Sequence, residues 1–219
     1  MARISLDPPQ TLWYRLGARF SRRRYGVMLD PGAAIGHNVQ VGRSYAIFEL
    51  QVERWHQLDR ELKDLAVMAA AATIGCAWCM DFGYWDATVN HAVPAEKAHD
   101  TVNWRGSKVF SELELLVMRY AEAMTATPPR VTDAMVDALR EHLNEAQLVE
   151  LTAIIAVENL RSRINSALGL TAQGFTDWDE LAAADDPVPA DPIPVEPVPA
   201  EPIPAAPVPA GPGSHPGTR

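Results

Sequence analysis

Hydrophobic residues recur along most of the chain at the spacing of amphipathic helices. Apolar positions three or four residues apart occupy the segments 10–24, 44–57, 59–75 and 145–169. Sustained period-two alternation rich in Val, Ile and Thr, which is the pattern of a half-buried strand, does not occur. The pattern therefore predicts an all-α protein.

Capping residues and helix breakers divide this pattern into separate helices. Asp59 is a suitable N-cap and Gly75 a suitable end for one helix, while Thr132 begins another that runs through His142. Residues 26–42 are rich in turn signals and leave room for one short helical piece. Capping boxes at Ser111-Glu112-Leu113-Glu114 and at Asn144 to Gln147 begin two further helices. We also expect a helix from the cysteines to about Asn90 and a short helix at 95–98.

Two of these helices carry stripes that we expect to face the core. In the segment 44–57 the inward residues are Ala46, Ile47, Leu50 and Trp55. The last helix has the most apolar stripe, which should form the centre of the core: Leu148, Leu151, Ile155, Leu160, Ile164 and Leu168.

The composition changes completely near residue 183. The run Pro187-Val188-Pro189-Ala190-Asp191 is repeated with small changes four times. Proline at this density prevents helix and strand pairing, so we predict three parts: a helical extension at 1–25, a helical domain at 26–180 and a disordered acidic tail at 181–219. A spacer or solubilising role suits the tail best, and docking into an aromatic-lined groove is the alternative.

Charge and hydropathy exclude several classes of partner. The 219 residues carry a formal net charge of −9, so no basic field attracts nucleic acid or a membrane surface. No apolar run approaches the about 20 residues that span a bilayer, and the N-terminal residues lack the apolar segment of a signal peptide. We expect a soluble cytoplasmic protein.

The chain contains two cysteines, paired as Cys76-x-x-Cys79. On the first turn of a helix their sulfurs can approach closely enough to form a disulfide, and the positive helix end lowers the pKa of a thiol there. Such a thiolate can attack a peroxide to give a sulfenic acid, which the second thiol converts to a disulfide. The motif therefore predicts a redox-active disulfide that a reductant must reopen.

Other roles for the cysteines need residues that this sequence lacks. Structural zinc takes four ligands, and the chain has no second cysteine pair and only scattered histidines, so we expect no metal and no cofactor. In thioredoxin-like proteins the motif follows a strand, and none is predicted here. Two buried structural thiols remain the alternative.

The sequence resembles the carboxymuconolactone decarboxylase/AhpD-like alkylhydroperoxidase family over roughly residues 20–175. The resemblance implies an AhpD-like helical domain that assembles into homo-oligomers, often trimers or multiples of them, with the cysteines near a subunit-lined pocket. It is carried mainly by these blocks: Leu58-Asp59-Arg60-Glu61-Leu62-Lys63-Asp64-Leu65-Ala66-Val67, Gly75-Cys76-Ala77-Trp78-Cys79-Met80-Asp81-Phe82-Gly83, Glu158-Asn159 and Asn165-Ser166-Ala167-Leu168-Gly169.

The peroxidase members of that family share a motif of Glu, eleven residues, then Cys-x-x-Cys-x-x-x-His. The match implies Cys79 as the peroxidatic thiol, Cys76 as the resolving thiol and Asp64 as a proton acceptor in place of the glutamate. Gly83 stands where the histidine would share a proton with the thiol. His91 lies about 18 Å further along a regular helix and needs a bend or a second subunit to take over, so we expect weak peroxidase activity.

These features favour a thiol-dependent peroxidase or dithiol oxidoreductase that uses a small-molecule peroxide and an unknown dithiol reductant. Two alternatives stay open. A cofactor-free lactone decarboxylase is the family's other branch, and it has no need of the cysteines. A non-enzymatic helical scaffold or binding protein is the second, and the Pro-rich tail supports it. The aromatic residues Trp78, Phe82, Tyr84 and Trp85 are expected to form either pocket walls or core.

Overall fold

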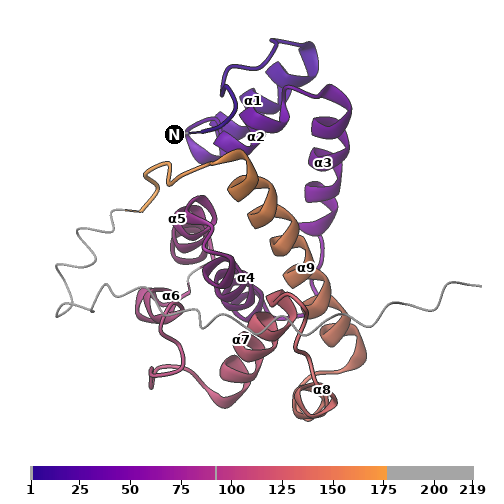
Figure 1. The fold of residues 1–219 in the computed structure, drawn as a ribbon, viewed down its shortest axis with the longest axis vertical. Helices are drawn as coiled ribbons and strands as arrows, with labels where there is room; N and C mark the ends of the chain where they lie inside the picture. The colour runs from indigo at the N-terminus through magenta and orange to yellow at the C-terminus, as the bar shows by residue number, and fades with distance from the viewer. Residues whose placement is uncertain (1, 92, 177–219) are drawn as a thin grey trace, which may run out of the picture. The chain divides into compact units, whose positions relative to one another are not determined.

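Every element in the described part of the protein is a helix. The computed structural model describes residues 2–91 and 93–176, which lie in the first of two units into which the chain divides, Met1–Trp178. The all-α prediction is confirmed, and the predicted Pro-rich tail lies outside the described residues. The elements are α1 (Leu12–Tyr25), α2 (Asp30–Ile35), α3 (Val39–Val52), α4 (Arg60–Ile74), α5 (Ala77–Trp85), the π-helical turn η1 (Asp86–Asn90), α6 (Ala95–Asp100), α7 (Glu112–Thr125), α8 (Asp133–Arg140) and α9 (Glu145–Leu168) (Figure 1).

Local capping fixes most of these boundaries where the sequence places them. The Asp59 side chain accepts the N–H of Glu61 at 2.9 Å, and Gly75 ends α4 in the left-handed conformation with φ 77°. Both predicted capping boxes form, at the starts of α7 and α9. The predicted helix from the cysteines to residue 90 is also present, with η1 as its last turn.

The prediction for α3 is wrong in two respects. This helix begins at Val39 because the Asn38 side chain accepts the N–H groups of Gln40 and Val41, both at 3.1 Å. Residues Ala46, Ile47 and Leu50 are exposed in this chain and do not face the core. The end of α3 makes an inward contact through Val52, which packs against Ile154 and Val157 of α9. The predicted inward residue Trp55, which follows the helix, is partly buried against the same cluster.

The core is centred on α4, which packs against α7 and α9. Its small side chains Ala66, Ala70 and Ala71 are fully buried, and they allow the neighbouring helices to approach closely. Leu151 and Ile155 of α9 are fully buried as predicted. Leu160 is 43% exposed, because five residues after Ile155 the helix has turned about 140° away from that stripe.

The helices other than α8 fall into two groups around α9. Figure 1 shows α1, α2 and α3 together at one end of α9, and α4, α5, α6 and α7 on its other side. The Arg3 N–H donates to the Leu168 carbonyl at 2.8 Å, which ties the N-terminal segment to the end of α9. No helix among the described residues is long and apolar enough to cross a membrane.

Candidate active site

The two cysteines lie where α4 ends and α5 begins. Gly75 reverses the chain, Cys76 takes the N-cap position of α5, and Cys79 lies in the first turn. Their sulfurs are bonded at 2.11 Å with the Cα atoms 5.3 Å apart, so the predicted disulfide is confirmed in the structure. The Cys76 Sγ also accepts the Cys79 N–H at 3.2 Å, in the manner of a capping side chain.

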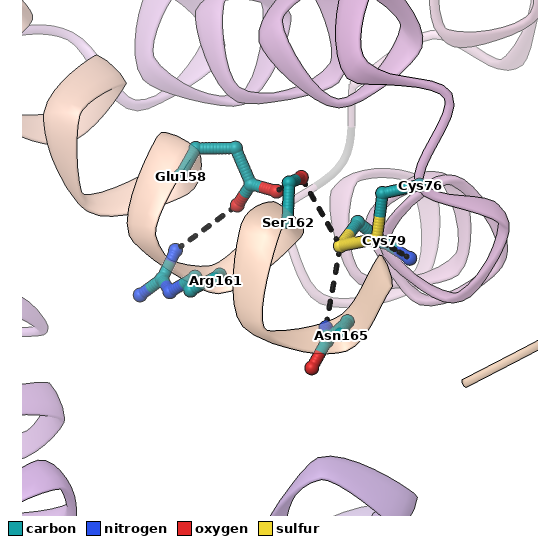
Figure 2. The surroundings of a disulfide bond; sticks show 6 residues. All are labelled: Cys76, Cys79, Glu158, Arg161, Ser162 and Asn165. Atoms are coloured by element: carbon teal, nitrogen blue, oxygen red, sulfur yellow. Dashed lines mark hydrogen bonds and ion pairs between the residues drawn. A yellow bond between two sulfur atoms is a disulfide. The ribbon is translucent and has the colours of Figure 1, made fainter. Parts of the chain in front are cut away.

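Two polar side chains of α9 lie within hydrogen-bonding distance of the Cys79 sulfur. The Ser162 Oγ lies 3.3 Å from this sulfur and the Asn165 Nδ2 lies 3.4 Å from it. Figure 2 shows both side chains reaching from one face of α9 toward the disulfide. The Asn165 NH₂ group is a donor and favours a negatively charged sulfur, so it stabilises a thiolate at Cys79 after reduction.

Behind Ser162 lies a buried carboxyl group, Glu158. The Ser162 Oγ is 2.6 Å from the Glu158 Oε1, and Glu158 is only 2% exposed. Arg161 contacts Glu158 at 3.6 Å (Figure 2). Its Nε donates to Glu49 of α3 at 2.9 Å. Burial raises the pKa of Glu158 from 4.5 to about 7, because Arg161 and the Ser162 hydrogen bond offset only part of the desolvation.

Asp64 shares a cavity wall with Cys79. Its carboxylate lies 3.2 Å from the Arg60 Nε and 2.9 Å from the His91 Nδ1, which η1 brings back toward α4. In the part of the chain that the structure describes, these are its polar partners, and neither cysteine sulfur is among them. His91 therefore reaches Asp64, and the role of Asp64 in proton transfer stays a prediction.

Gly83 follows Cys79 by one turn of α5 and lines the same cavity. A Cβ placed there would meet the Met68 Cγ at 3.6 Å, an ordinary contact distance. Close packing therefore does not require glycine at this position. The space that the family motif fills with an imidazole belongs here to the cavity.

Asp81 has a structural role. It is fully buried, and its carboxylate accepts four consecutive backbone N–H groups at 2.7–3.2 Å, those of residues 173–176. The Gln173 Oε1 in turn accepts the Trp78 Nε1–H at 3.0 Å. These bonds tie the segment after α9 to the helix that carries the cysteines.

The cavity beside Cys79 has a volume of about 560 Å³ and lies between α1–α3 on one side and α4, α5 and α9 on the other. Cys79 lines it and Cys76 does not. Trp78 and Phe82 form part of the wall with their rings stacked at 5.0 Å, whereas Tyr84 and Trp85 do not line the cavity. Charged groups share the wall: Glu49, Glu53, Arg60, Lys63, Asp64, Asp86, Glu158 and Arg161.

The residues that the sequence analysis missed are Glu158, Ser162 and Asn165. They continue the buried stripe of Leu151 and Ile155 at steps of three and four residues. The spacing is present in the sequence, but these three residues are polar and were therefore not counted as part of an apolar stripe. A polar run on the buried face of a helix is the signal that could have found them.

An all-helical domain with a cysteine pair at the start of a helix is typical of one class of protein, and similarity to known proteins identifies that class. Residues 42–123 match the model of the Carboxymuconolactone decarboxylase family. The chain is 34% identical over 154 residues to the uncharacterized protein YnjA of Escherichia coli. The aligned residues cover 70% of this chain and 84% of YnjA. The chain belongs to the carboxymuconolactone decarboxylase family.

Solved structures share the fold at low sequence identity. The debrominase Bmp8 in complex with 2,3,4-tribromopyrrole matches with a TM-score of 0.70 at 19% identity, covering 80% of this chain and 95% of that one. The alkylhydroperoxidase AhpD core from Ralstonia eutropha, an uncharacterized peroxidase-related protein, matches with a TM-score of 0.68 at 17% identity. This match covers 80% of this chain and 94% of that one. The predicted AhpD-like fold is therefore confirmed.

Proposed function

We propose that this protein is a thiol-dependent peroxidase, or dithiol oxidoreductase, that cycles through the Cys76–Cys79 disulfide. The observation that carries the proposal is the bonded cysteine pair at a helix start with Cys79 on the cavity wall. Cys79 is the peroxidatic residue because a substrate in the cavity meets its sulfur first. Cys76 is the resolving residue.

The cycle uses one peroxide and one dithiol per turn. The Cys79 thiolate attacks a peroxide oxygen, the O–O bond breaks, and the alcohol or water leaves with one proton. The Cys76 thiol then attacks the sulfenic acid, releasing water and closing the disulfide. An external dithiol reduces it by exchange and is itself oxidised. The family motif implies that Asp64, on the same wall, accepts the Cys79 proton through water, but its carboxylate is paired with Arg60 and His91.

Peroxide turnover with dithiothreitol as reductant tests this function in the full chain. Cys79→Ser should abolish turnover. With dithiothreitol removed, Cys76→Ser should reduce one equivalent of peroxide and leave a sulfenic acid that a dimedone probe labels. Turnover unchanged in both variants would contradict the proposal, and the exposed Ser166→Ala should behave as the wild type.

Reductive dehalogenation of an aromatic substrate is a second candidate, favoured by the stacked Trp78 and Phe82 rings in the cavity wall. Two thiols would supply two electrons and two protons, so a carbon–halogen bond becomes carbon–hydrogen and hydrogen halide leaves. The fold neighbour Bmp8 is a debrominase. Bromide release from 2,3,4-tribromopyrrole by the reduced protein, and its loss in Cys79→Ser, would support this candidate over peroxide reduction.

We also propose that copies of this chain associate through α1 and α3. Leu12, Leu16 and Phe20 of α1 are all more than half exposed, as is expected of a face that a partner covers. Leu16 and Phe20 also line the cavity, so a second copy would help to enclose it. Light scattering should show an oligomer that Leu12→Glu dissociates and that Val149→Glu, at an exposed site on α9, leaves intact. A monomeric wild type would contradict this.

A further inference from the structure

A continuous line of hydrogen-bonding atoms joins Glu158 to Cys79 through Ser162. The Glu158 Oε1 lies 2.6 Å from the Ser162 Oγ, which lies 3.3 Å from the Cys79 Sγ. Ser162 is fully buried and Glu158 nearly so. Because Ser162 lies between the two groups and is buried, a proton that leaves Cys79 through its hydroxyl reaches Glu158.

The protonation state of Glu158 decides which way the Ser162 hydroxyl points. A serine has one hydroxyl proton and can also accept through its lone pairs. When Glu158 is ionised, Ser162 donates to it and turns a lone pair toward Cys79, which favours the neutral thiol. When Glu158 is protonated, it donates to Ser162, whose hydroxyl then donates to Cys79 and favours the thiolate. Moving one proton along the line therefore converts the thiol to the thiolate.

We propose that Glu158, acting through Ser162, is the proton acceptor and donor of Cys79 and does the work of the motif histidine that Gly83 replaces. The proposal rests on the proposed function for the peroxide step alone. Glu158 acts through Ser162, so both are positioning and proton-transfer residues.

The electrostatic surroundings of Glu158 suit this task. Glu158 faces Arg161 on its own helix, α9, and faces Glu49 and Tyr45 on α3. Glu49 and Tyr45 both interact with the Arg161 guanidinium as well. Arg161 therefore divides its charge between Glu49 and Glu158 and leaves Glu158 partly uncompensated.

The charged groups of α4 that share the cavity wall are occupied by other partners. Lys63 is paired with Glu150 at 2.8 Å, and Asp64 with Arg60. The pKa of Glu158, about 7, keeps both of its forms populated near neutral pH, where a general acid and base is most effective.

In the reaction one proton passes from Cys79 to Glu158 and later returns through Ser162. Glu158 takes the Ser162 proton as Ser162 takes the S–H proton of Cys79, and the thiolate attacks the peroxide. The O–O bond breaks, a sulfur–oxygen bond forms, and the proton held by Glu158 passes back through Ser162 to the leaving oxygen. The sum is thiol plus hydroperoxide giving sulfenic acid plus alcohol, with no other reactant.

The first test measures the pH dependence of iodoacetamide alkylation in the Cys76→Ser background, where Cys79 is the one remaining thiol. Iodide leaves without a proton, so this rate reports the thiolate alone. Two coupled groups titrate in two steps, so we expect two inflections between about pH 5 and 9. Glu158→Gln and Ser162→Ala should each leave one inflection. The matched controls Glu145→Gln and Ser166→Ala, both at exposed positions of α9, should keep two.

The second test compares alkylation with peroxide reduction in the otherwise unmodified chain at pH 7. Glu158→Gln removes a neighbouring negative charge, so alkylation should not slow. Peroxide reduction should fall about 100-fold, because the leaving oxygen loses its proton donor. Damage to the fold would lower both rates together, so the split between them identifies proton transfer.

Each result decides the matter. A single inflection in the Cys76→Ser background, or two inflections that persist in Glu158→Gln and Ser162→Ala, would overturn the relay even if peroxide turnover is present. Two inflections lost in both variants, in a protein without peroxide turnover, would uphold the relay and overturn the proposed function. Circular dichroism checks folding, and Ser162→Ala, which removes one oxygen atom, carries the test if Glu158→Gln does not fold.

Discussion

The Glu158 carboxylate lies 2.6 Å from the Ser162 hydroxyl, on a part of α9 that is shielded from water. Burial raises the pKa of Glu158 from 4.5 to about 7, so the folded protein holds this proton more tightly than the unfolded chain. The resulting stabilisation is complete below about pH 4.5 and is lost as the pH rises through 7. The unfolding free energy of the wild type should therefore fall by roughly 3 kcal/mol between about pH 4.5 and pH 8. Glu158→Gln imitates the protonated acid, so its unfolding free energy should not show this fall.

Urea denaturation of the oxidised protein at a series of pH values measures this difference. The wild type and Glu158→Gln should be similar in stability near pH 4.5 and diverge as the pH rises, with the variant more stable at pH 8. Glu145→Gln, an exposed change on the same helix, should follow the wild type. Parallel curves for the wild type and Glu158→Gln would show that Glu158 is ionised throughout.

Asp81 should contribute strongly to stability because its carboxylate accepts the N–H groups of residues 173–176. Asp81→Asn keeps one acceptor oxygen and turns an NH₂ group toward these donors, which should cost about 2–3 kcal/mol of unfolding free energy. Hydrogen exchange at residues 173–176 should also accelerate. Asp137→Asn, at an exposed position of α8, should change neither quantity, and a similar result for Asp81→Asn would contradict the role assigned to the carboxylate.

The sequence was sufficient for helix boundaries because capping depends on adjacent residues. Asp59, Gly75 and the two capping boxes act within a few residues of themselves, and all form as predicted. The start of α3 was missed because Asn38 was not recognised as its cap. Its exposed Ile47 and Leu50 show that helical periodicity identifies an apolar face without identifying what covers it.

The candidate site was only half predictable for a different reason. Cys76 and Cys79 are close in sequence, so one helical turn sets their distance. Ser162 lies 83 residues from Cys79, and only the packing of α9 against α5 brings the two together. Counting residues could not place Asp64 on the cavity wall that Cys79 lines either, because α4 and α5 fold back on each other at Gly75.

Glycine at position 83 should be replaceable without strain. Its φ is not in the left-handed region, and a Cβ would sit 3.6 Å from the Met68 Cγ. Gly83→Ala should therefore raise the unfolding free energy by up to about 1 kcal/mol through helix propensity. Gly75→Ala is the matched comparison, and it should cost about 1–2 kcal/mol because φ is 77° there. Chemical denaturation of both variants checks the contrast, and a loss at position 83 would indicate a close contact that the structure does not show.

Restoring the motif histidine should partly replace Glu158. Position 83 lies four residues after Cys79 on α5 and lines the same cavity, so an imidazole there can share the Cys79 proton. In the Glu158→Gln background, Gly83→His should recover about 10-fold of the lost peroxide rate, with a pH dependence centred near the histidine pKa of about 6.5. Gly83→Gln has a side chain of similar size that does not titrate, so it should recover nothing. Equal recovery by both would mean that filling the cavity, and not proton transfer, limits the reaction.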